Sequence, residues 1–485
     1  MLTNLLQLGG MQLVIAVTAV VRNKVLAVRL GSDGLGEFMQ LALVVLTLSV
    51  LAAFGFGMSL NRNAAAAPDD AARQRLLAQA NAVNLALSAL LVGATAALLA
   101  WRPELIGIVG LEPSAAVIGA FAVLAVFVPV EAAVQHRVAF LTGAMDIKGM
   151  TSGRSVALLI GTAVTVPLVW YLGLVGAALQ YLLLTGTILV ALDRRCRRLG
   201  YRPWQVAWDH ATFRLLVGFG IASLVASFAY QLSDVIVRSA LVRSVDLAEN
   251  GVYQAAQSIT FQVRAVVLGS VGSYAIASFA RDTSRAHIEE TCDRLLATIV
   301  PLGGLAFAGL GLFSGPAVLV LYTADFLPAQ AIVPILLVAD FLLVATWTLN
   351  APLLALGRVP IWLGIELTGA VVRAAAGVAL VGTLGGVGIA IGYSLGAAAQ
   401  LLVTVVVFRH VLHLAVARMR IVLFVVAVGV VAVASAAGAR VTFDLTTYAV
   451  GLVALAAFGL LGVHFAVGLP TAWAQVRARL PGRRS

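Results

Sequence analysis

The sequence of 485 residues is poor in charge and contains very little cysteine. Asp, Glu, Lys and Arg make up 11% of the chain against 61% hydrophobic residues, more apolar surface than an aqueous fold could bury. Its only cysteines, Cys196 and Cys292, are far apart, which argues against a disulfide framework or a zinc site. His410 and His413 have no further ligand nearby in the sequence, so we expect no metal ion.

Several sequence motifs that are typical of enzymes are also missing. The sequence has no G-x-x-x-x-G-K-S/T phosphate-binding loop, so we expect no ATP hydrolysis. It has no long polar loop with clustered His, Arg and carboxylates, and no pairing of a nucleophile with a base. We therefore predict no enzyme activity and no cofactor. The net charge of +11 indicates membrane topology and attraction to anionic headgroups, not nucleic-acid binding.

Hydrophobic stretches of membrane-spanning length repeat down almost the whole chain, and the mean hydropathy is +1.02. Hydrocarbon offers no partner to an exposed N–H or C=O group, so each span must be helical. We predict an all-α polytopic membrane protein of about 14 helices. The predicted spans cover residues 5–28, 38–58, 80–100, 115–134, 156–171, 175–192, 215–238, 252–279, 295–313, 332–349, 361–381, 385–408, 422–437 and 448–467.

Basic residues alternate between the two sides that this span order defines. Loops on one side hold 23 of the 32 Lys and Arg residues, with Arg137 and Arg154 among them, and the opposite loops hold four. Cationic loops resist translocation, so the rich side is predicted to be cytoplasmic, together with both termini. The basic C-terminal tail then serves as a solvated retention signal. We expect the first hydrophobic stretch to remain as a helix, because it lacks a basic leader and a small-residue cleavage site.

Two halves of the chain share a sequence pattern. The pattern L-G-x-V-G-x-A-x-x-Y occurs at residues 172–181 and again, 212 residues later, at residues 384–393. Residues 36–41 recur at 251–256, and residues 141–143 resemble residues 355–357, with offsets of 215 and 214. Three matches in order favour an internal duplication over chance in a chain rich in Gly and Ala.

An even number of spans separates equivalent positions, so the two copies should have the same orientation in the membrane. This arrangement predicts two parallel-repeat lobes of six helices around a central cleft. The predicted divisions are residues 1–200 for the N-terminal lobe, 201–415 for the C-terminal lobe, and 416–485 for two further helices and the tail.

Four short motifs resemble a known family. They are L-G-S-D-G-L-G at residues 30–36, G-x-Y-x-x-A at 251–256, L-L-A-L-G-R at 353–358 and G-G-V-G-I-A at 385–390. Together they look like the Wzx-type polysaccharide flippases of the multidrug/oligosaccharidyl-lipid/polysaccharide exporter (MOP) superfamily. The resemblance implies transfer of an undecaprenyl-diphosphate-linked oligosaccharide between the leaflets of the bacterial cytoplasmic membrane. It also implies lipid neighbours, with a glycan polymerase or other assembly protein as a candidate partner.

Charged residues at mid-membrane depth are the candidate substrate ligands, because a cation there costs roughly 2.5–3.5 kcal/mol and usually faces water or a partner. Arg264 lies near the middle of its span, and Gln254 and Gln257 precede it close to one helical stripe. Arg373 shares a helix face with Glu366, seven residues earlier. Guanidinium groups match diphosphate oxygens, although either arginine could instead pair with a carboxylate or with carbonyls to lock two helices together.

Further cations lie near the ends of the first helix in each half. Asp234 and Arg238 are spaced to form an intrahelical pair, and an offset of 214 aligns Arg238 with Lys24. The family resemblance favours Arg22 as a cavity residue. Arg22 and Lys24 are about 200° apart on a straight helix, so both cannot face the same cleft. The carboxylates that could bind a proton or Na⁺ during transport are Glu131, Asp234, Asp340 and Glu366.

Two other functions stay open at this point. A drug/ion antiporter of the same superfamily would favour an acidic and aromatic cavity over a cationic one. A scaffold for cell-envelope assembly, with no transport activity, would use the buried arginines as static pairs. The flippase is favoured here because the guanidinium groups inside the spans match a diphosphate headgroup.

Overall fold

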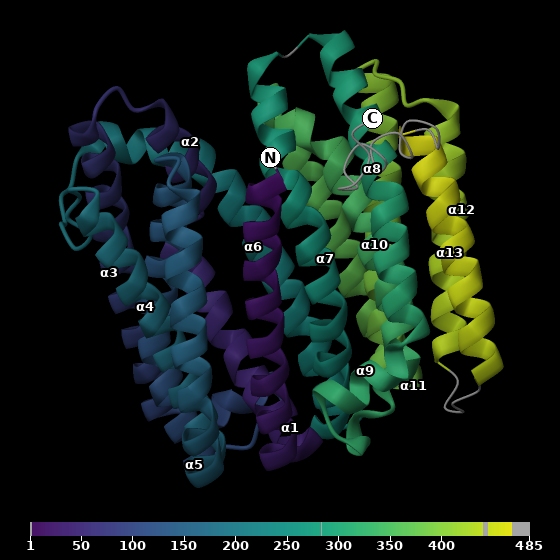
Figure 1. The fold of residues 1–485 in the computed structure, drawn as a ribbon. Helices are drawn as coiled ribbons and strands as arrows, with labels where there is room; N and C mark the ends of the chain where they lie inside the picture. Colours follow the sequence, from purple (N-terminus) through teal and green to yellow (C-terminus); the bar gives the residue numbers. More distant parts are fainter. Residues whose placement is uncertain (1, 283, 440–444, 468–485) are drawn as a thin grey trace, which may run out of the picture. The chain divides into compact units, whose positions relative to one another are not determined.

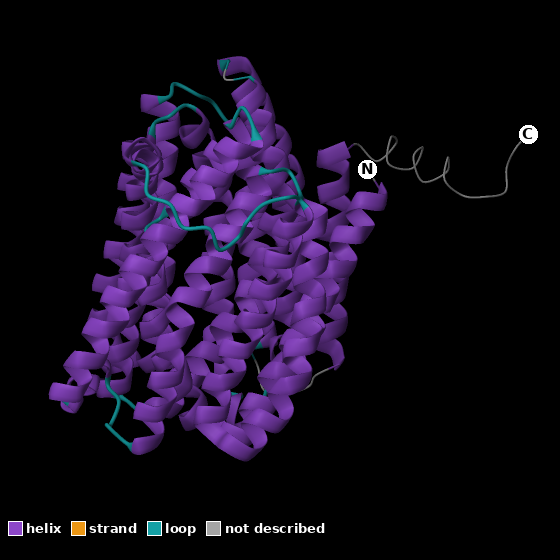
Figure 2. Ribbon diagram, turned by 90° about the vertical axis from the view of Figure 1, so that its left-hand side faces the viewer, coloured by secondary structure: helices purple, strands orange, loops and turns teal. Residues whose placement is uncertain are grey.

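The computed structural model describes residues 2–282, 284–439 and 445–467 (Figure 1). Regular structure in these residues is entirely helical (Figure 2). The basic C-terminal tail lies outside them. The α-helices are α1 (Leu2–Ala53), α2 (Phe56–Ala66), α3 (Asp70–Trp101), α4 (Ala115–Gly143), α5 (Ile147–Arg198), α6 (His210–Ser244), α7 (Leu247–Arg281), α8 (Arg285–Leu312), α9 (Ser314–Leu321), α10 (Ala329–Ala355), α11 (Val359–Val406), α12 (Arg418–Gly438) and α13 (Leu445–Val467).

Nine helical segments of the described chain are long and apolar enough to cross a membrane. Three of these segments have 50, 50 and 53 residues, more than twice the length that a bilayer needs. Each of the three contains a glycine with a non-helical backbone, which is Gly31, Gly173 or Gly385, and the first also contains the turn at Phe54 and Gly55 between α1 and α2. When the parts of each long segment before and after its non-helical glycine are counted separately, every predicted span overlaps a helical segment. The all-α membrane fold is confirmed, with fourteen as an approximate count.

The repeated pattern at 172–181 and 384–393 forms the same tight helical turn twice. Gly173 has φ 56° and ψ −126°, and Gly385 has φ 56° and ψ −135°. Three residues later, a Cβ on Gly176 would lie 2.0 Å from the carbonyl oxygen of Leu168, and one on Gly388 would lie 2.5 Å from that of Leu380. Only glycine permits this positive φ and this close approach, so the motif encodes a helical hairpin.

Replacing Gly385 by alanine is expected to lower the free energy of unfolding by about 1–3 kcal/mol, because the residue is held at positive φ. The new Cβ would also lie 3.2 Å from Glu249 Oε1. The matched control is Gly382→Ala on the same helix, where a Cβ meets no atom within 4 Å. A detergent-denaturation titration should show Gly382→Ala to be neutral or stabilising, and equal effects at the two sites would contradict the hairpin assignment.

The structure corrects the third sequence match by two residues. Helices α4 and α10 end at residues 143 and 355, and α5 and α11 begin at residues 147 and 359. In the connecting turns, Met145 has φ 61° and Gly357 has φ 69°. All three pairs have an offset of 212, so the alignment of residues 141–143 with 355–357 is wrong. Helix ends and backbone conformation decide the equivalence, whereas the matching letters reflected only the Leu- and Gly-rich composition.

Repeat-equivalent glycines also contact each other. A Cβ on Gly36 would lie 1.9 Å from the carbonyl oxygen of Leu247, and one on Gly251 would lie 2.1 Å from that of Ser32. The offset from Ser32 to Leu247 is the same 215 residues as from Gly36 to Gly251, so the contact is reciprocal. Such a self-matching contact is typical of a two-fold relation, which supports the predicted duplication at this point.

Contacts divide the chain into two compact units. Unit 1 contains the described residues of 1–254, 320–326 and 374–389, and unit 2 contains the described residues of 255–319, 327–373 and 390–485. In unit 2, helices α8, α10 and α12 pack against one another, and α13 packs on α8 (Figure 1). The sequence-based divisions at residues 200 and 415 stay a prediction.

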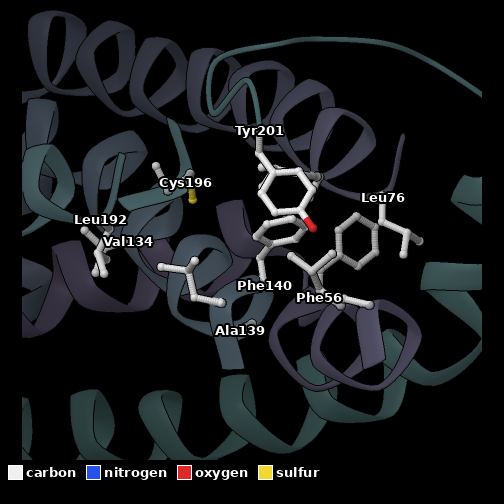
Figure 3. Packing of buried hydrophobic residues seen from close by; sticks show 14 of the residues in the cluster. Phe56, Leu76, Val134, Ala139, Phe140, Leu192, Cys196 and Tyr201 are labelled. Carbon is white, nitrogen blue, oxygen red and sulfur yellow. The ribbon is translucent and has the colours of Figure 1, made fainter. Parts of the chain in front are cut away.

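The core of unit 1 includes aromatic and aliphatic side chains of α2, α3 and α4 (Figure 3). Phe140 of α4 meets Tyr201 edge to face, with the ring centroids 4.9 Å apart. Arg137 corrects the sequence analysis, because it lies inside α4 with 0% exposure and not in a loop. A single cation six residues from a helix end does not disturb a hydropathy window, so the helix boundary was placed too early.

Candidate functional site

Arg264, Asp340 and Tyr393 form a charged cluster inside unit 2. They come from α7, α10 and the second half of α11. Arg264 Nη1 donates to Asp340 Oδ1 at 2.6 Å, and the Tyr393 hydroxyl donates to the same oxygen at 2.7 Å. Arg264 Nη1 also contacts the Tyr393 hydroxyl. Asp340 is nearly completely buried, whereas 22% of the Arg264 side chain is exposed, so Arg264 is the accessible member of the pair.

Tyr393 links this ion pair to a second arginine. The guanidinium carbon of Arg373 lies 4.8 Å from the centre of the Tyr393 ring, and Arg373 is 2% exposed. Arg264 similarly lies 5.2 Å from the ring centre of Phe261. Aromatic faces attract cations most strongly where water is excluded, so both rings favour charged guanidinium groups at this site. The cluster of Arg264, Arg373, Asp340 and Tyr393 is called the arginine cluster below.

The structure reveals Tyr393 as a member of the site, which the sequence analysis missed. Its signal was present, because Tyr393 is the final residue of the duplicated pattern and aligns with Tyr181. A tyrosine carries no charge at neutral pH, so a pattern of intramembrane charges does not include it. Both arginines have protein partners in this structure, so their role as cavity residues stays a prediction.

Glu366 lies elsewhere on the α11 hairpin and accepts a hydrogen bond from the Gln400 side chain at 2.9 Å. Gln400 is 3% exposed, and a Cβ on Gly369 would lie 2.8 Å from its Oε1 atom. Glu366 therefore has an amide donor fixed by close helix packing. Its predicted role in ion coupling is untested.

Arg238 and Gln254 meet in unit 1. Arg238 is 3% exposed and donates to Asn250 Oδ1 at 2.8 Å and to Gln254 Oε1 at 2.6 Å. Asn250 in turn donates to the backbone carbonyl of Gly36 at 2.9 Å, which ties this group to the glycine contact described above. Gln254 thus binds Arg238, while Gln257 is half-buried farther along α7. Asp234 lies one turn before Arg238 on α6.

The alignment of Lys24 with Arg238 stays a prediction. The reciprocal glycine contact fixes an offset of 215 at Gly36 and Gly251, which lie beyond the non-helical Gly31, so it does not set the register of the preceding helix. Asn23 Nδ2 donates to the Tyr322 hydroxyl at 3.0 Å, and Lys24 Nζ contacts the backbone carbonyl of the same tyrosine.

Tyr181 is the repeat equivalent of Tyr393 in unit 1. Tyr181 has Arg22 and Glu131 as electrostatic neighbours, and Glu131 also interacts with Arg154. The Tyr181 ring stacks on Phe127 with centroids 4.7 Å apart. The two repeats thus have similar surroundings for their tyrosines. Tyr181 lies near Glu131 of α4 and an arginine, and Tyr393 lies near Asp340 of α10 and an arginine. Arg22 and Glu131 were predicted separately from the sequence, and only the packing of α1 and α4 near Tyr181 relates them.

Residues 1–277 match a family model described as polysaccharide biosynthesis protein. The chain belongs to this family. Curated proteins yield no sequence match to the chain. Among solved structures, the lipid II flippase MurJ in an inward closed conformation has a TM-score of 0.72 at 11% identity, covering 96% of this chain and 97% of MurJ.

Multidrug transporters share the same fold. An inward-facing multidrug resistance MATE family transporter of the MOP superfamily has a TM-score of 0.62 at 16% identity, covering 86% of this chain and 95% of that transporter. An outward-facing structure of a multidrug resistance MATE family transporter has a TM-score of 0.57 at 16% identity, covering 83% and 95%. The predicted resemblance to MOP superfamily exporters is confirmed. This member of the polysaccharide biosynthesis family is a multi-pass membrane protein with the same fold as MurJ and the MATE transporters.

Proposed function

We propose that this polysaccharide biosynthesis family member moves a polyprenyl-diphosphate-linked oligosaccharide across the bacterial cytoplasmic membrane. The observation that carries the proposal is the arginine cluster. Its ionised groups, Arg264, Arg373 and Asp340, sum to one excess positive charge. Moving a diphosphate through hydrocarbon unaided would cost on the order of tens of kcal/mol, and fixed cations offset much of that penalty.

In this mechanism Arg264 is the first ligand of the diphosphate. Its partly exposed guanidinium is held by Asp340 and Tyr393, so the incoming phosphate oxygens compete with one carboxylate oxygen for the same cation. Arg373 is fully buried behind the Tyr393 ring and adds positive potential without a direct contact. Substrate binding then weakens the Arg264–Asp340 pair, and α7 and α10 become free to move apart.

Release of Arg264 leaves the buried carboxylate of Asp340 without its ion pair, and a coupling cation could take the place of the guanidinium. Asp340 is therefore our first candidate for ion coupling, ahead of Glu131, Asp234 and Glu366. The driving force could equally be the membrane potential or consumption of the product outside. We propose that both termini and the basic loops face the cytoplasm.

The polyprenyl tail needs an apolar path, because its transfer into water would oppose the whole process. An apolar cavity of about 550 Å³ lies in unit 2 among α8, α12 and α13. Its walls include Leu312, Val430 and Leu455. We propose that this cavity accepts part of the tail while the headgroup occupies the polar site.

The test uses the native protein in sealed vesicles that contain a fluorescent polyprenyl-diphosphate oligosaccharide. In protein-free vesicles a membrane-impermeant quencher should reach only the outer-leaflet half of the probe. With the protein, the quenched fraction should rise towards completeness within minutes. A phosphatidylcholine probe of similar size is the specificity control and should stay half protected.

The same vesicles separate the alternatives. Uptake of a cationic dye, with no movement of the oligosaccharide probe, would contradict the flippase and support a drug/ion antiporter that uses Asp340 and the aromatic rings. Failure to move either probe would favour a scaffold of envelope assembly.

A further inference from the structure

A groove of about 760 Å³ lies between the two halves of α5, within unit 1. Its floor is made of small residues, among them Gly153, Ala157 and Gly186. Val156, Ile160 and Val190 border it and are each about half exposed. The groove belongs to neither the arginine cluster nor the cavity between α8, α12 and α13.

One end of the groove is strongly basic. Arg194, Arg195 and Arg198 line it on the last turns of α5. Arg195 is engaged by Asp146, with one of its two hydrogen bonds at 2.7 Å, and Gly149 leaves room for this pair. No hydrogen bond or ion pair engages the side chain of Arg194 or Arg198 among the residues that the structure describes. Both are exposed, so the basic end can bind an anion.

The groove has the length of one membrane leaflet. From Arg195 to Leu183 the helix rises about 18 Å, and from Gly149 to Ile160 the opposite wall rises about 16 Å. Half of a hydrocarbon core is about 15 Å thick. An apolar channel of this depth with cations at its mouth fits a lipid, whose chain lies in the channel and whose phosphate lies at the mouth.

We propose that this groove is a binding site for an anionic phospholipid of the leaflet on the arginine-rich side of the membrane. Arg194 and Arg198 bind the phosphate, and one acyl chain lies over Gly153 and Gly186 between the halves of α5. The charge selects an anionic over a zwitterionic headgroup, because these two arginines have no carboxylate partner in the described part of the chain and leave uncompensated positive charge at the mouth. Bound lipid would brace the two halves of the α5 hairpin against each other.

Lipid titrations of the full-length protein, read by native mass spectrometry, test the site. The double variant Arg194→Ala/Arg198→Ala should weaken binding of one phosphatidylglycerol by about 10- to 30-fold, with phosphatidylcholine binding unchanged. Gly186→Leu should remove the same bound lipid, because a Cβ at Gly186 meets no protein atom within 4 Å and the leucine would fill the channel.

The matched controls remove the same charge, or add the same side-chain volume, at positions outside the groove. Arg75→Ala/Arg197→Ala removes two exposed charges that do not line the groove, and Gly93→Leu adds a leucine at an open position of α3. Both controls should bind phosphatidylglycerol as the native protein does.

Equal losses in the controls, or no loss in the groove variants, would overturn the proposal. So would displacement of phosphatidylglycerol from the groove by an equimolar polyprenyl diphosphate, which would make the groove a substrate site. Circular dichroism confirms that each variant folds. The proposed flippase activity depends on the arginine cluster, so either proposal can fail without the other.

Discussion

Arg264→Ala is expected to slow oligosaccharide headgroup translocation by about 100-fold or more, when the rate is compared at equal amounts of folded protein. The variant removes the accessible cation of the arginine cluster, so the diphosphate loses charge-assisted hydrogen bonds worth about 1.5–3 kcal/mol each. Loss of about 2.7 kcal/mol corresponds to that rate change. The quencher assay in sealed vesicles measures it directly.

A second variant separates a role in substrate binding from a role in pairing with Asp340. Arg264→Ala/Asp340→Asn removes both charges of the ion pair and leaves the Tyr393 hydroxyl with a neutral partner. If Arg264 binds the diphosphate, the double variant stays as slow as the single one. Recovery of translocation in the double variant would show that Arg264 serves only to neutralise Asp340, and the proposed headgroup site would be wrong.

Arg137→Met is expected to lower the free energy of unfolding by about 3–5 kcal/mol, the usual result of breaking a buried ion pair. Arg137 is completely buried and donates to Asp193 Oδ1 at 3.1 Å, to Asn81 Oδ1 at 2.5 Å and to the carbonyl of Pro203 at 2.5 Å. Its guanidinium also lies 5.0 Å from the ring centre of Trp204. Thermal unfolding in detergent, followed by circular dichroism, measures the loss.

Two comparisons make this prediction specific. Arg75→Met removes an exposed arginine of α3 and should change stability by less than about 0.5 kcal/mol. Arg137→Met/Asp193→Leu removes the partner charge as well and should recover much of the lost stability, since apolar replacement of a whole buried pair is often neutral. A single variant as stable as Arg75→Met would show that Arg137 does not anchor the connector between α5 and α6.

The fold could be predicted from the sequence because hydrocarbon requires every span to be apolar and to satisfy its backbone hydrogen bonds within a helix. Fourteen apolar stretches were found by hydropathy alone, and each overlaps a helical segment. The duplicated pattern predicted the repeat correctly at Gly173 and Gly385, where only glycine permits the turn. It was wrong by two residues at 141–143, where Leu and Gly matched by composition and no backbone constraint selected the register.

The candidate site was predicted only in part. Hydropathy identifies a costly charge but does not identify its partner, since Arg264 and Asp340 are separated by 76 residues and lie on different helices. Arg373 and Glu366 were expected on one face, and both meet the second half of α11, where Arg373 lies against Tyr393 and Glu366 against Gln400. The identity of these two partners was not predicted. Side-chain partners across helices depend on rotation and packing, which a single-helix projection does not contain.

The amino-acid sequence by itself determined that this protein is a helical membrane protein with a duplicated body, because burial of backbone polar groups and the conformational freedom of glycine act residue by residue. The tertiary structure alone decided which charges meet. Arg264 joins Asp340 and Tyr393, Arg238 joins Asn250, and Arg194 and Arg198 face a lipid-length groove. These pairings depend on how helices distant in sequence pack, and a local pattern does not specify that packing.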